Sequence, residues 1–205
     1  MSTVKPQRDM TEAEYLAYER ASSTKHEYYK GRIYAMTGAK EAHNLIAGNI
    51  IAALHPQLRR KGCRIYPSDM RVKIMQTGLN TYPDIAVVCG PPQFTDNVRD
   101  TIINPIVIIE VLSVSTERYD RGMKFQHYRT IETLDDYMLV AQDHPHIEHF
   151  SRQENGLWIF QEATNVALRI NIPSIGCVLH LQDVYAQVEF EQENTAITRE
   201  IPPEE

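Results

Sequence analysis

The longest hydrophobic pattern in the chain has the spacing of a helix. From residue 41 to about residue 60, apolar side chains recur three and four positions apart, which places them on one helix face. Because proline has no amide hydrogen and clashes with the preceding turn, we expect this helix to bend or divide at His55-Pro56. The apolar face consists of Leu45, Ile46, Ile50, Ile51 and Leu54.

Shorter apolar runs have the length and composition of strands. Residues 83–89 and 106–112 are almost continuously apolar and rich in β-branched side chains, which is typical of strands at the centre of a sheet. Residues 63–75 predict a strand with a possible break near Ser68, and residues 137–141 predict a further strand. Antiparallel strands are also expected around Ile147, at residues 158–160 and at residues 168–170.

The N-terminal part of the chain predicts a helix and a hairpin. Thr11 and Glu14 have the spacing of a capping box, so a short helix is expected over residues 11–20. Residues 27–34 predict a hairpin that turns at Lys30-Gly31.

Two further helices complete the pattern, at residues 118–129 and at residues 181–188. The order of elements predicts an α/β fold in which helices flank a mixed β-sheet, with additional antiparallel strands. The chain contains no internal repeat and no low-complexity linker, so we expect a single domain over residues 10–190.

Composition excludes some classes of protein. The chain has 205 residues, and no apolar stretch reaches the roughly 18 residues that a membrane span needs. The first ten residues are polar and carry no apolar signal segment. The three cysteines, Cys63, Cys89 and Cys177, are scattered, which predicts reduced thiols in a cytoplasmic protein rather than a disulfide framework or a zinc site.

The formal net charge of −6 argues against a nucleic-acid partner at first sight, because phosphate binding favours basic surfaces. The charge is unevenly spread, however. Residues 189–205 hold six glutamates against Arg199, and without them the chain is close to neutral. Residues 191–205 are therefore predicted to be an acidic, disordered tail, and net charge is weak evidence for or against nucleic acid.

Two acids stand out because each lies in or beside a strongly apolar run. Asp84 precedes the run Ile85-Ala86-Val87-Val88, and Glu110 follows Ile106-Val107-Ile108-Ile109. A carboxylate in such a setting is costly to bury unless it is paired or binds a metal. Two acids on neighbouring strands would form an all-oxygen site for Mg²⁺ or Mn²⁺. The alternative is a pair of strand-end carboxylates that cap loops, and spacing alone does not decide between the two.

Lys124 and Tyr128 lie one turn apart on the helix expected at residues 118–129. Taken alone, Lys124 is best explained as a solvated lysine on a basic helix. The functional alternative is an ammonium that orients an attacking water and neutralises charge on a phosphate. Tyr128 is expected to pack, with a hydroxyl that makes a hydrogen bond.

Other polar residues have weaker patterns. His43 lies in the first turn of the long helix, and Asp69 is expected to break a strand, with a place in the metal site as the alternative. His144, His146 and Glu148 alternate on one strand face, which favours a solvated surface over a transition-metal site. A basic run could contact phosphates but is slightly more typical of a solvated helix end and an edge strand. This run contains Arg59, Arg60, Lys61, Arg64, Arg71 and Lys73.

Three motifs together resemble the PD-(D/E)xK nuclease superfamily and, more narrowly, the Uma-two-type endonucleases. They are Tyr82-Pro83-Asp84, Ile109-Glu110-Val111-Leu112-Ser113, and Asp120-Arg121-Gly122-Met123-Lys124 continuing to Tyr128. The resemblance runs from about residue 10 to residue 190. It implies a restriction-endonuclease-like fold and an enzyme that hydrolyses DNA.

The resemblance also implies a set of site residues. Asp84, Glu110 and the backbone carbonyl of Val111 would ligate Mg²⁺, or Mn²⁺ in its place. The superfamily usually has a lysine two residues after the glutamate, where this chain has Leu112, and Lys124 on the following helix fits the missing role. Catalysis would then rest on Asp84, Glu110 and Lys124. Supporting residues would be Glu27, His43, Asp69 and Tyr128. A homodimer is expected by analogy with the superfamily alone.

Two other functions stay open at this point. Because position 112 lacks the lysine, the chain could be a catalytically weak or inactive nuclease fold that acts as a binding module. A metal-dependent hydrolase of small phosphoesters is less favoured, because the chain has no glycine-rich loop that could cradle a phosphate.

Overall fold

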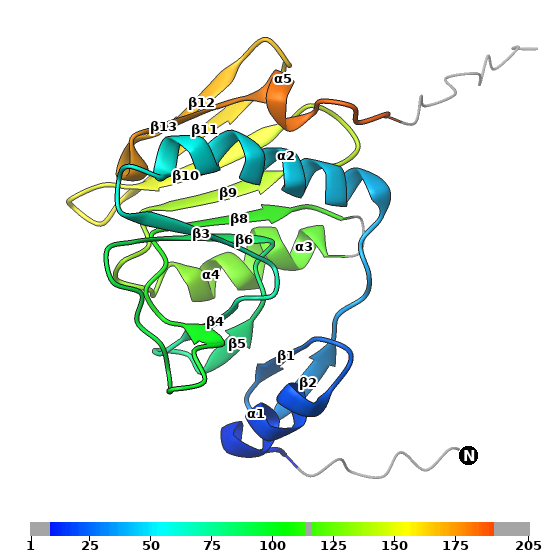
Figure 1. Ribbon diagram of the computed structural model, residues 1–205, viewed down its shortest axis with the longest axis vertical. Helices are drawn as coiled ribbons and strands as arrows, with labels where there is room; N and C mark the ends of the chain where they lie inside the picture. Colours follow the sequence, from blue (N-terminus) through cyan, green and yellow to red (C-terminus); the bar gives the residue numbers. More distant parts are fainter. Residues whose placement is uncertain (1–8, 114–115, 191–205) are drawn as a thin grey trace, which may run out of the picture.

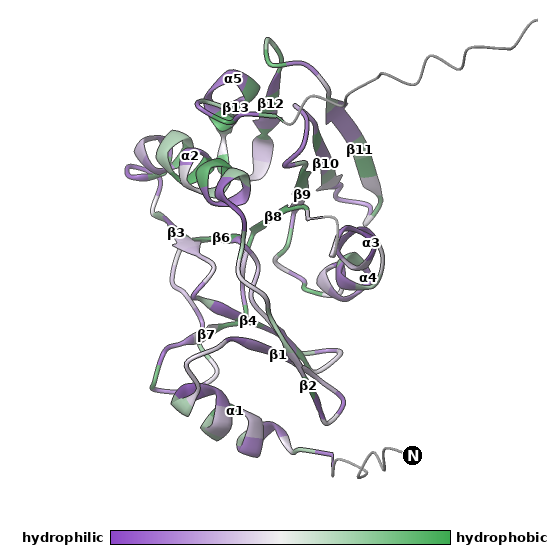
Figure 2. Ribbon diagram, turned by 90° about the vertical axis from the view of Figure 1, so that its right-hand side faces the viewer, coloured by the Kyte–Doolittle hydropathy of each residue, from purple (hydrophilic) through white to green (hydrophobic). Residues whose placement is uncertain are grey.

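The computed structural model describes residues 9–113 and 116–190, so the predicted tail at residues 191–205 lies outside the described residues. The fold is mixed α/β, as expected. A six-stranded sheet forms the middle layer, with one long helix on one face and short helices and a second sheet on the other (Figure 1). Hydrophobic residues are frequent along α2 and along the strands of the six-stranded sheet (Figure 2). None of the helices in the described residues is long and apolar enough to cross a membrane.

The six-stranded sheet has the order β11-β10-β9-β8-β6-β3. Neighbouring strands are antiparallel except for β8 and β9, which are parallel, so the sheet is mixed. The strands expected at residues 83–89 and 106–112 are β6 and β8, which pair with each other inside the sheet. The strands are β3 (Cys63–Pro67), β6 (Ile85–Cys89), β8 (Val107–Val111), β9 (Asp136–Val140), β10 (Ile147–Arg152) and β11 (Trp158–Ala163).

A second sheet of five strands has the order β2-β1-β5-β4-β7. The segment at residues 63–75, expected as one strand with a break, is divided between the two sheets, because a turn at residues 68–70 separates β3 from β4. The five strands are β1 (His26–Tyr29), β2 (Arg32–Ala35), β4 (Arg71–Ile74), β5 (Leu79–Thr81) and β7 (Thr101–Ile102).

The hairpin of β1 and β2 has the predicted two-residue turn. Lys30 and Gly31 have φ angles of 47° and 83°, the left-handed values of a type I′ turn. Helix α1 (Glu12–Ala21) covers one face of this hairpin, where the rings of Tyr15 and Tyr28 stack with centroids 4.8 Å apart. The predicted capping box at the start of α1 is present.

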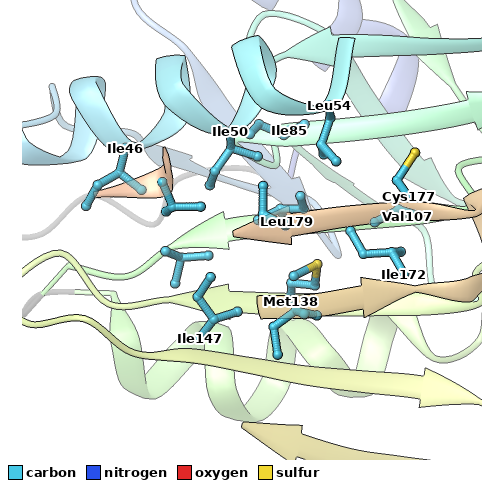
Figure 3. Close-up of a cluster of buried hydrophobic side chains, with 14 of the residues drawn as sticks. Ile46, Ile50, Leu54, Ile85, Val107, Met138, Ile147, Ile172, Cys177 and Leu179 are labelled. Atoms are coloured by element: carbon cyan, nitrogen blue, oxygen red, sulfur yellow. The ribbon is translucent and has the colours of Figure 1, made fainter. Parts of the chain in front are cut away.

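Helix α2 (Glu41–Leu58) packs on the first face of the six-stranded sheet. It is one helix and does not divide at His55-Pro56, because Pro56 lies in the last turn, where it removes a single backbone hydrogen bond. The side chains of Ile46, Ile50 and Leu54 point from α2 into the core that the sheet forms with the last segment of the chain (Figure 3). That segment contains β12 (Arg169–Ile172), the 3₁₀ helix η2 (Pro173–Ile175), β13 (Cys177–His180) and α5 (Leu181–Val184).

The opposite face of the sheet meets a second core. The helix expected at residues 118–129 is divided into α3 (Glu117–Tyr119), a π-helical turn η1 (Asp120–Lys124) and α4 (Phe125–Tyr128). These elements cover the side chains of alternate strand residues, such as Ala86 in β6 and Ile108 in β8. The last predicted helix, at residues 181–188, is a single turn.

The prediction of reduced cysteines is wrong for two of the three. Cys63 and Cys89 form a disulfide, while Cys177 is free and buried. They are 26 residues apart in sequence, but they are direct partners in the register of β3 and β6. Sequence spacing alone could not reveal this, because the proximity is created by strand pairing.

Candidate active site

Asp84 and Glu110 lie side by side on the second face of the six-stranded sheet. Ile85 and Ile109 are register partners in β6 and β8, so Asp84 and Glu110 are the next facing positions along the pair. Their side chains fall on the same face because side chains alternate along a strand. The amide nitrogen of Asp84 lies 3.4 Å from Oε2 of Glu110.

Both oxygens of Asp84 are held by neighbours. The Val111 amide donates to Oδ2 at 2.7 Å, and Nε2 of His43 lies 3.0 Å from Oδ1. Within a strand, the N–H and C=O of one residue point to the same side, so the Val111 carbonyl is directed toward the side on which Asp84 lies. His43 comes from the first turn of α2, so the helix on the first face of the sheet also contributes a contact to Asp84.

Lys124 provides the positive charge next to Glu110. Its Nζ lies 2.8 Å from Oε1 of Glu110, 3.4 Å from Oδ1 of Asp120 and 3.6 Å from Oε1 of Glu27. Leu112, at the position where a lysine is usual, packs into the second core. The π-helical turn η1 lies over the same face of the sheet and supplies Lys124 there instead.

Two hydroxyl groups complete the hydrogen bonding of the carboxylates. Tyr128, one turn after Lys124, donates to Oε1 of Glu110 at 2.9 Å. Thr81, at the end of β5, donates to Oε1 of Glu27. The group is therefore assembled from both sheets and from the helical segment between them.

Burial controls the charge of the group. It raises the pKa of Glu110 to about 8; Lys124 lowers this pKa in part, and the nearby Asp120 and Asp84 raise it. Burial would lower the pKa of Lys124, but attraction by Glu110, Asp120 and Glu27 outweighs this and holds that pKa well above its ordinary value. Lys124 is therefore an ammonium, and the group has an excess of acids that a further cation would relieve.

The structure brings together most of the expected residues and adds others. Glu27, His43 and Tyr128 all contact Asp84, Glu110 or Lys124. Asp69 is not brought into the group: its side chain is 91% exposed in the turn after β3 and pairs with Lys25 at 3.3 Å.

Asp120 and Thr81 are contacts that sequence reasoning missed. Asp120 precedes Lys124 by four residues inside the third motif, and this spacing on a helix indicates a contact between the two side chains. Thr81 had no such signal, because its contact depends on how β5 pairs with β1.

The basic run does not form one surface. Arg71 is buried and bonded to Thr101 and Tyr82, Lys73 pairs with Glu12, and Lys61 binds backbone carbonyls near β13. Arg60, just beyond the end of α2, is 17 residues from His43, which corresponds to about 25 Å along a helix.

The histidine-rich segment forms ion pairs with neighbouring acids. His146 lies 3.1 Å from Glu162 and 4.0 Å from Glu148, which also pairs with Arg121. His149 is buried against Asp136 at 2.5 Å. Within residues 9–113 and 116–190, no group of three or more His, Cys, Asp or Glu side chains is arranged to hold a metal ion. The protein oxygens that a metal could find here are therefore the carboxylates of Asp84 and Glu110 and the backbone carbonyl of Val111.

One family model and two curated relatives match most of this chain. The family model Uma2, described as "Putative restriction endonuclease", matches residues 12–182. Two uncharacterized proteins of Synechocystis sp. (strain ATCC 27184 / PCC 6803 / Kazusa) are 35% identical over 162 residues and 33% identical over 177 residues. These matches cover 79% and 86% of this chain and 92% of each relative.

One solved structure has a similar fold. It is the crystal structure of a "putative nuclease belonging to DUF820" from Anabaena variabilis ATCC 29413, with a TM-score of 0.65 and 17% sequence identity. The match covers 84% of this chain and 96% of that chain. At this identity the likeness establishes the shared fold alone.

Proposed function

Because the chain belongs to the Uma2 family, whose description is "Putative restriction endonuclease", we propose that it is a metal-dependent endonuclease acting on DNA. The proposed catalytic residues are Asp84, Glu110 and Lys124. The observation that carries this proposal is the contact of Lys124 with Glu110 at 2.8 Å, beside Asp84. This contact supplies from a helix the ammonium that Leu112 cannot provide.

The donor chemistry fits Mg²⁺, with Mn²⁺ as the alternative. Asp84, Glu110 and the Val111 carbonyl offer oxygen atoms only, which hard divalent cations prefer. The excess of buried acids over the single ammonium supports the same assignment. When bound, such an ion polarises a phosphoryl oxygen and lowers the pKa of a coordinated water.

The residues of the chain have distinct proposed roles. Lys124 places a positive charge beside the reacting phosphate and orients the attacking water. His43 and the Val111 amide hold Asp84 in one orientation, while Tyr128 holds Glu110. Glu27 and Asp120 fix the position of the Lys124 ammonium. Asp69 has no role in this proposal, because its side chain lies elsewhere.

The test is hydrolysis of labelled DNA with and without Mg²⁺. We expect Asp84→Asn, Glu110→Gln and Lys124→Met each to lower the rate at least about a hundred-fold. Asp183→Asn is the matched control, because Asp183 is an exposed acid in α5, among the elements that pack on the opposite face of the six-stranded sheet. Equal Mg²⁺-dependent activity of the wild type and Asp84→Asn would show that the proposed site is wrong.

The binding module is the second candidate, and Leu112 is the observation that favours it. Calorimetric titration with Mn²⁺ separates the two functions. Saturable binding that is lost in Glu110→Gln supports the enzyme, whereas binding that is absent or unchanged in this variant favours the module. A single domain over residues 10–190, a homodimer and a cytoplasmic location stay predictions.

A further inference from the structure

The two faces of the β1–β2 hairpin differ in what covers them. On one face, Tyr28 packs against α1. The other face carries Glu27 and Tyr29, which meet Lys124 in η1 and His127 in α4. The hairpin is therefore fixed between α1 and the candidate active site, with its second face directed toward that site.

The register places two exposed side chains on the face that looks toward the site. Tyr34 is the partner of Glu27, and Arg32 is the partner of Tyr29, so each shares its partner's face. The helical segment covers Glu27 and Tyr29 but leaves Tyr34 49% exposed and Arg32 exposed. The ring of Tyr34 and the guanidinium of Arg32 are therefore exposed on the same hairpin face as Glu27.

The chain continues from this surface to the site itself. Strand β2 is the edge of its sheet, and the connection from it rises to α2, whose first turn carries His43 against Asp84 (Figures 1 and 2). Lys40, exposed just before α2, adds a second positive charge along this path. Neither Arg32 nor Lys40 takes part in an ion pair within the described part of the chain.

We propose that Tyr34, Arg32 and Lys40 form a strand-guiding surface that binds single-stranded DNA next to the scissile phosphate. The two cations fit a phosphate backbone, and the exposed ring of Tyr34 fits the face of a base. In a duplex, that face is covered by stacking on the neighbouring base pairs, so the surface favours a single strand over a duplex. This inference rests on the proposed function and names the substrate class of the same site.

Burial of the site residues supports the same choice. The side chains of Asp84 and His43 are each 16% exposed, and those of Glu110 and Lys124 are 4% and 5% exposed. A phosphate must therefore approach from the side of Asp84 and His43. A flexible single strand can bend into such a site more easily than a stiff duplex.

The experiment measures binding without cleavage, by fluorescence anisotropy of a labelled single-stranded oligonucleotide in EDTA, with the matching duplex in parallel. We expect the single strand to bind more tightly than the duplex. Tyr34→Ala should weaken single-strand binding about ten-fold, whereas Tyr34→Phe, which keeps the ring, should bind as the wild type does. Arg32→Ala should weaken binding and reduce its salt dependence.

Matched controls lie away from this surface. Tyr18→Ala removes a similarly exposed tyrosine, 44% exposed on α1, and Arg60→Ala removes an exposed arginine beyond the far end of α2. Both should bind DNA as the wild type does. The inference is overturned if the duplex binds as tightly as the single strand, if the wild type shows no saturable binding, or if Tyr34→Ala binds no more weakly than Tyr18→Ala.

Failure of the inference and failure of the proposed function are distinguishable. Single-strand binding that depends on Tyr34, without any Mg²⁺-dependent hydrolysis, leaves the inference standing and removes the enzyme. Hydrolysis that depends on Asp84 but is indifferent to Tyr34 removes the inference and leaves the enzyme.

Discussion

Lys124 has an unusual environment for a lysine, because its ammonium is buried next to three carboxylates. Glu110, Asp120 and Glu27 all lie within 4 Å of its Nζ, and the side chain is almost fully buried. An ammonium in this position balances part of the charge that strand β8 and its neighbours bury. It therefore serves the stability of the second core as well as the chemistry proposed for it.

Replacing Lys124 by methionine should destabilise the protein by about 3–5 kcal/mol in EDTA at about pH 9. This pH lies above the pKa of about 8 that Glu110 has beside Lys124, so the variant loses the cation that the ionised carboxylate pairs with. Urea denaturation followed by circular dichroism measures this loss. Lys73→Met is the control: Lys73 has one carboxylate partner, Glu12, which is one third exposed, so its loss should cost less than about 1 kcal/mol. Equal stability of Lys124→Met and the wild type would mean that Lys124 is not the counter-charge of these acids.

At the scale of elements, the sequence predicted the strands and the turn that interactions between neighbouring residues determine. Strands β6 and β8 were foreseeable because a short, continuous apolar run rich in β-branched residues is typical of a strand buried on both faces. The hairpin of β1 and β2 was foreseeable because Lys30-Gly31 can adopt the backbone that a tight turn requires. Asp84 and Glu110 could be singled out from the sequence because an acid in or beside a buried apolar run needs a partner.

Features that depend on pairing between distant segments were not foreseeable. Nothing near Ser68 indicates that β3 and β4 belong to different sheets. The contact of Thr81 with Glu27 arises from the pairing of β5 with β1, and the π-helical turn at Asp120 interrupts a segment whose pattern predicts an ordinary helix. The disulfide is a further example, because register alone makes Cys63 and Cys89 neighbours.

Reduction of the disulfide should weaken the link between β3 and β6. The closed loop spans 26 residues, and loss of this constraint on the unfolded chain corresponds to about 2–4 kcal/mol. Denaturant titration with and without dithiothreitol measures the effect. Cys63→Ser, which cannot form the bond, should be insensitive to the reductant and match the reduced wild type. A wild type whose transition does not move on reduction would contradict this assignment.

At the scale of the whole molecule, the site lies where independent parts of the fold meet. The six-stranded sheet supplies Asp84 and Glu110, the second sheet supplies Glu27, and the first turn of α2 supplies His43. The helical segment between the sheets supplies Lys124. Any shift between these layers would separate the carboxylates from their cation, so the two cores that hold the layers together also preserve the geometry of the site.

The net negative charge of the chain repels DNA, the proposed partner, at long range. Five glutamates and one arginine follow residue 190, so removing residues 191–205 takes the formal charge from −6 to −2. A less negative protein repels DNA less strongly, and the repulsion acts over about a Debye length, roughly 10 Å at 0.1 M salt.

A chain that ends at residue 190 should therefore bind single-stranded DNA a few-fold more tightly than the full chain at low salt. The difference should vanish near 1 M salt, where the Debye length is about 3 Å. The measurement is the same anisotropy titration, repeated across salt concentrations in EDTA. A full-length variant with the five glutamates changed to glutamine is the control, because it removes the charge and keeps the segment. If truncation and neutralisation differ, the segment acts through contacts; if neither tightens binding, its charge does not reach the DNA.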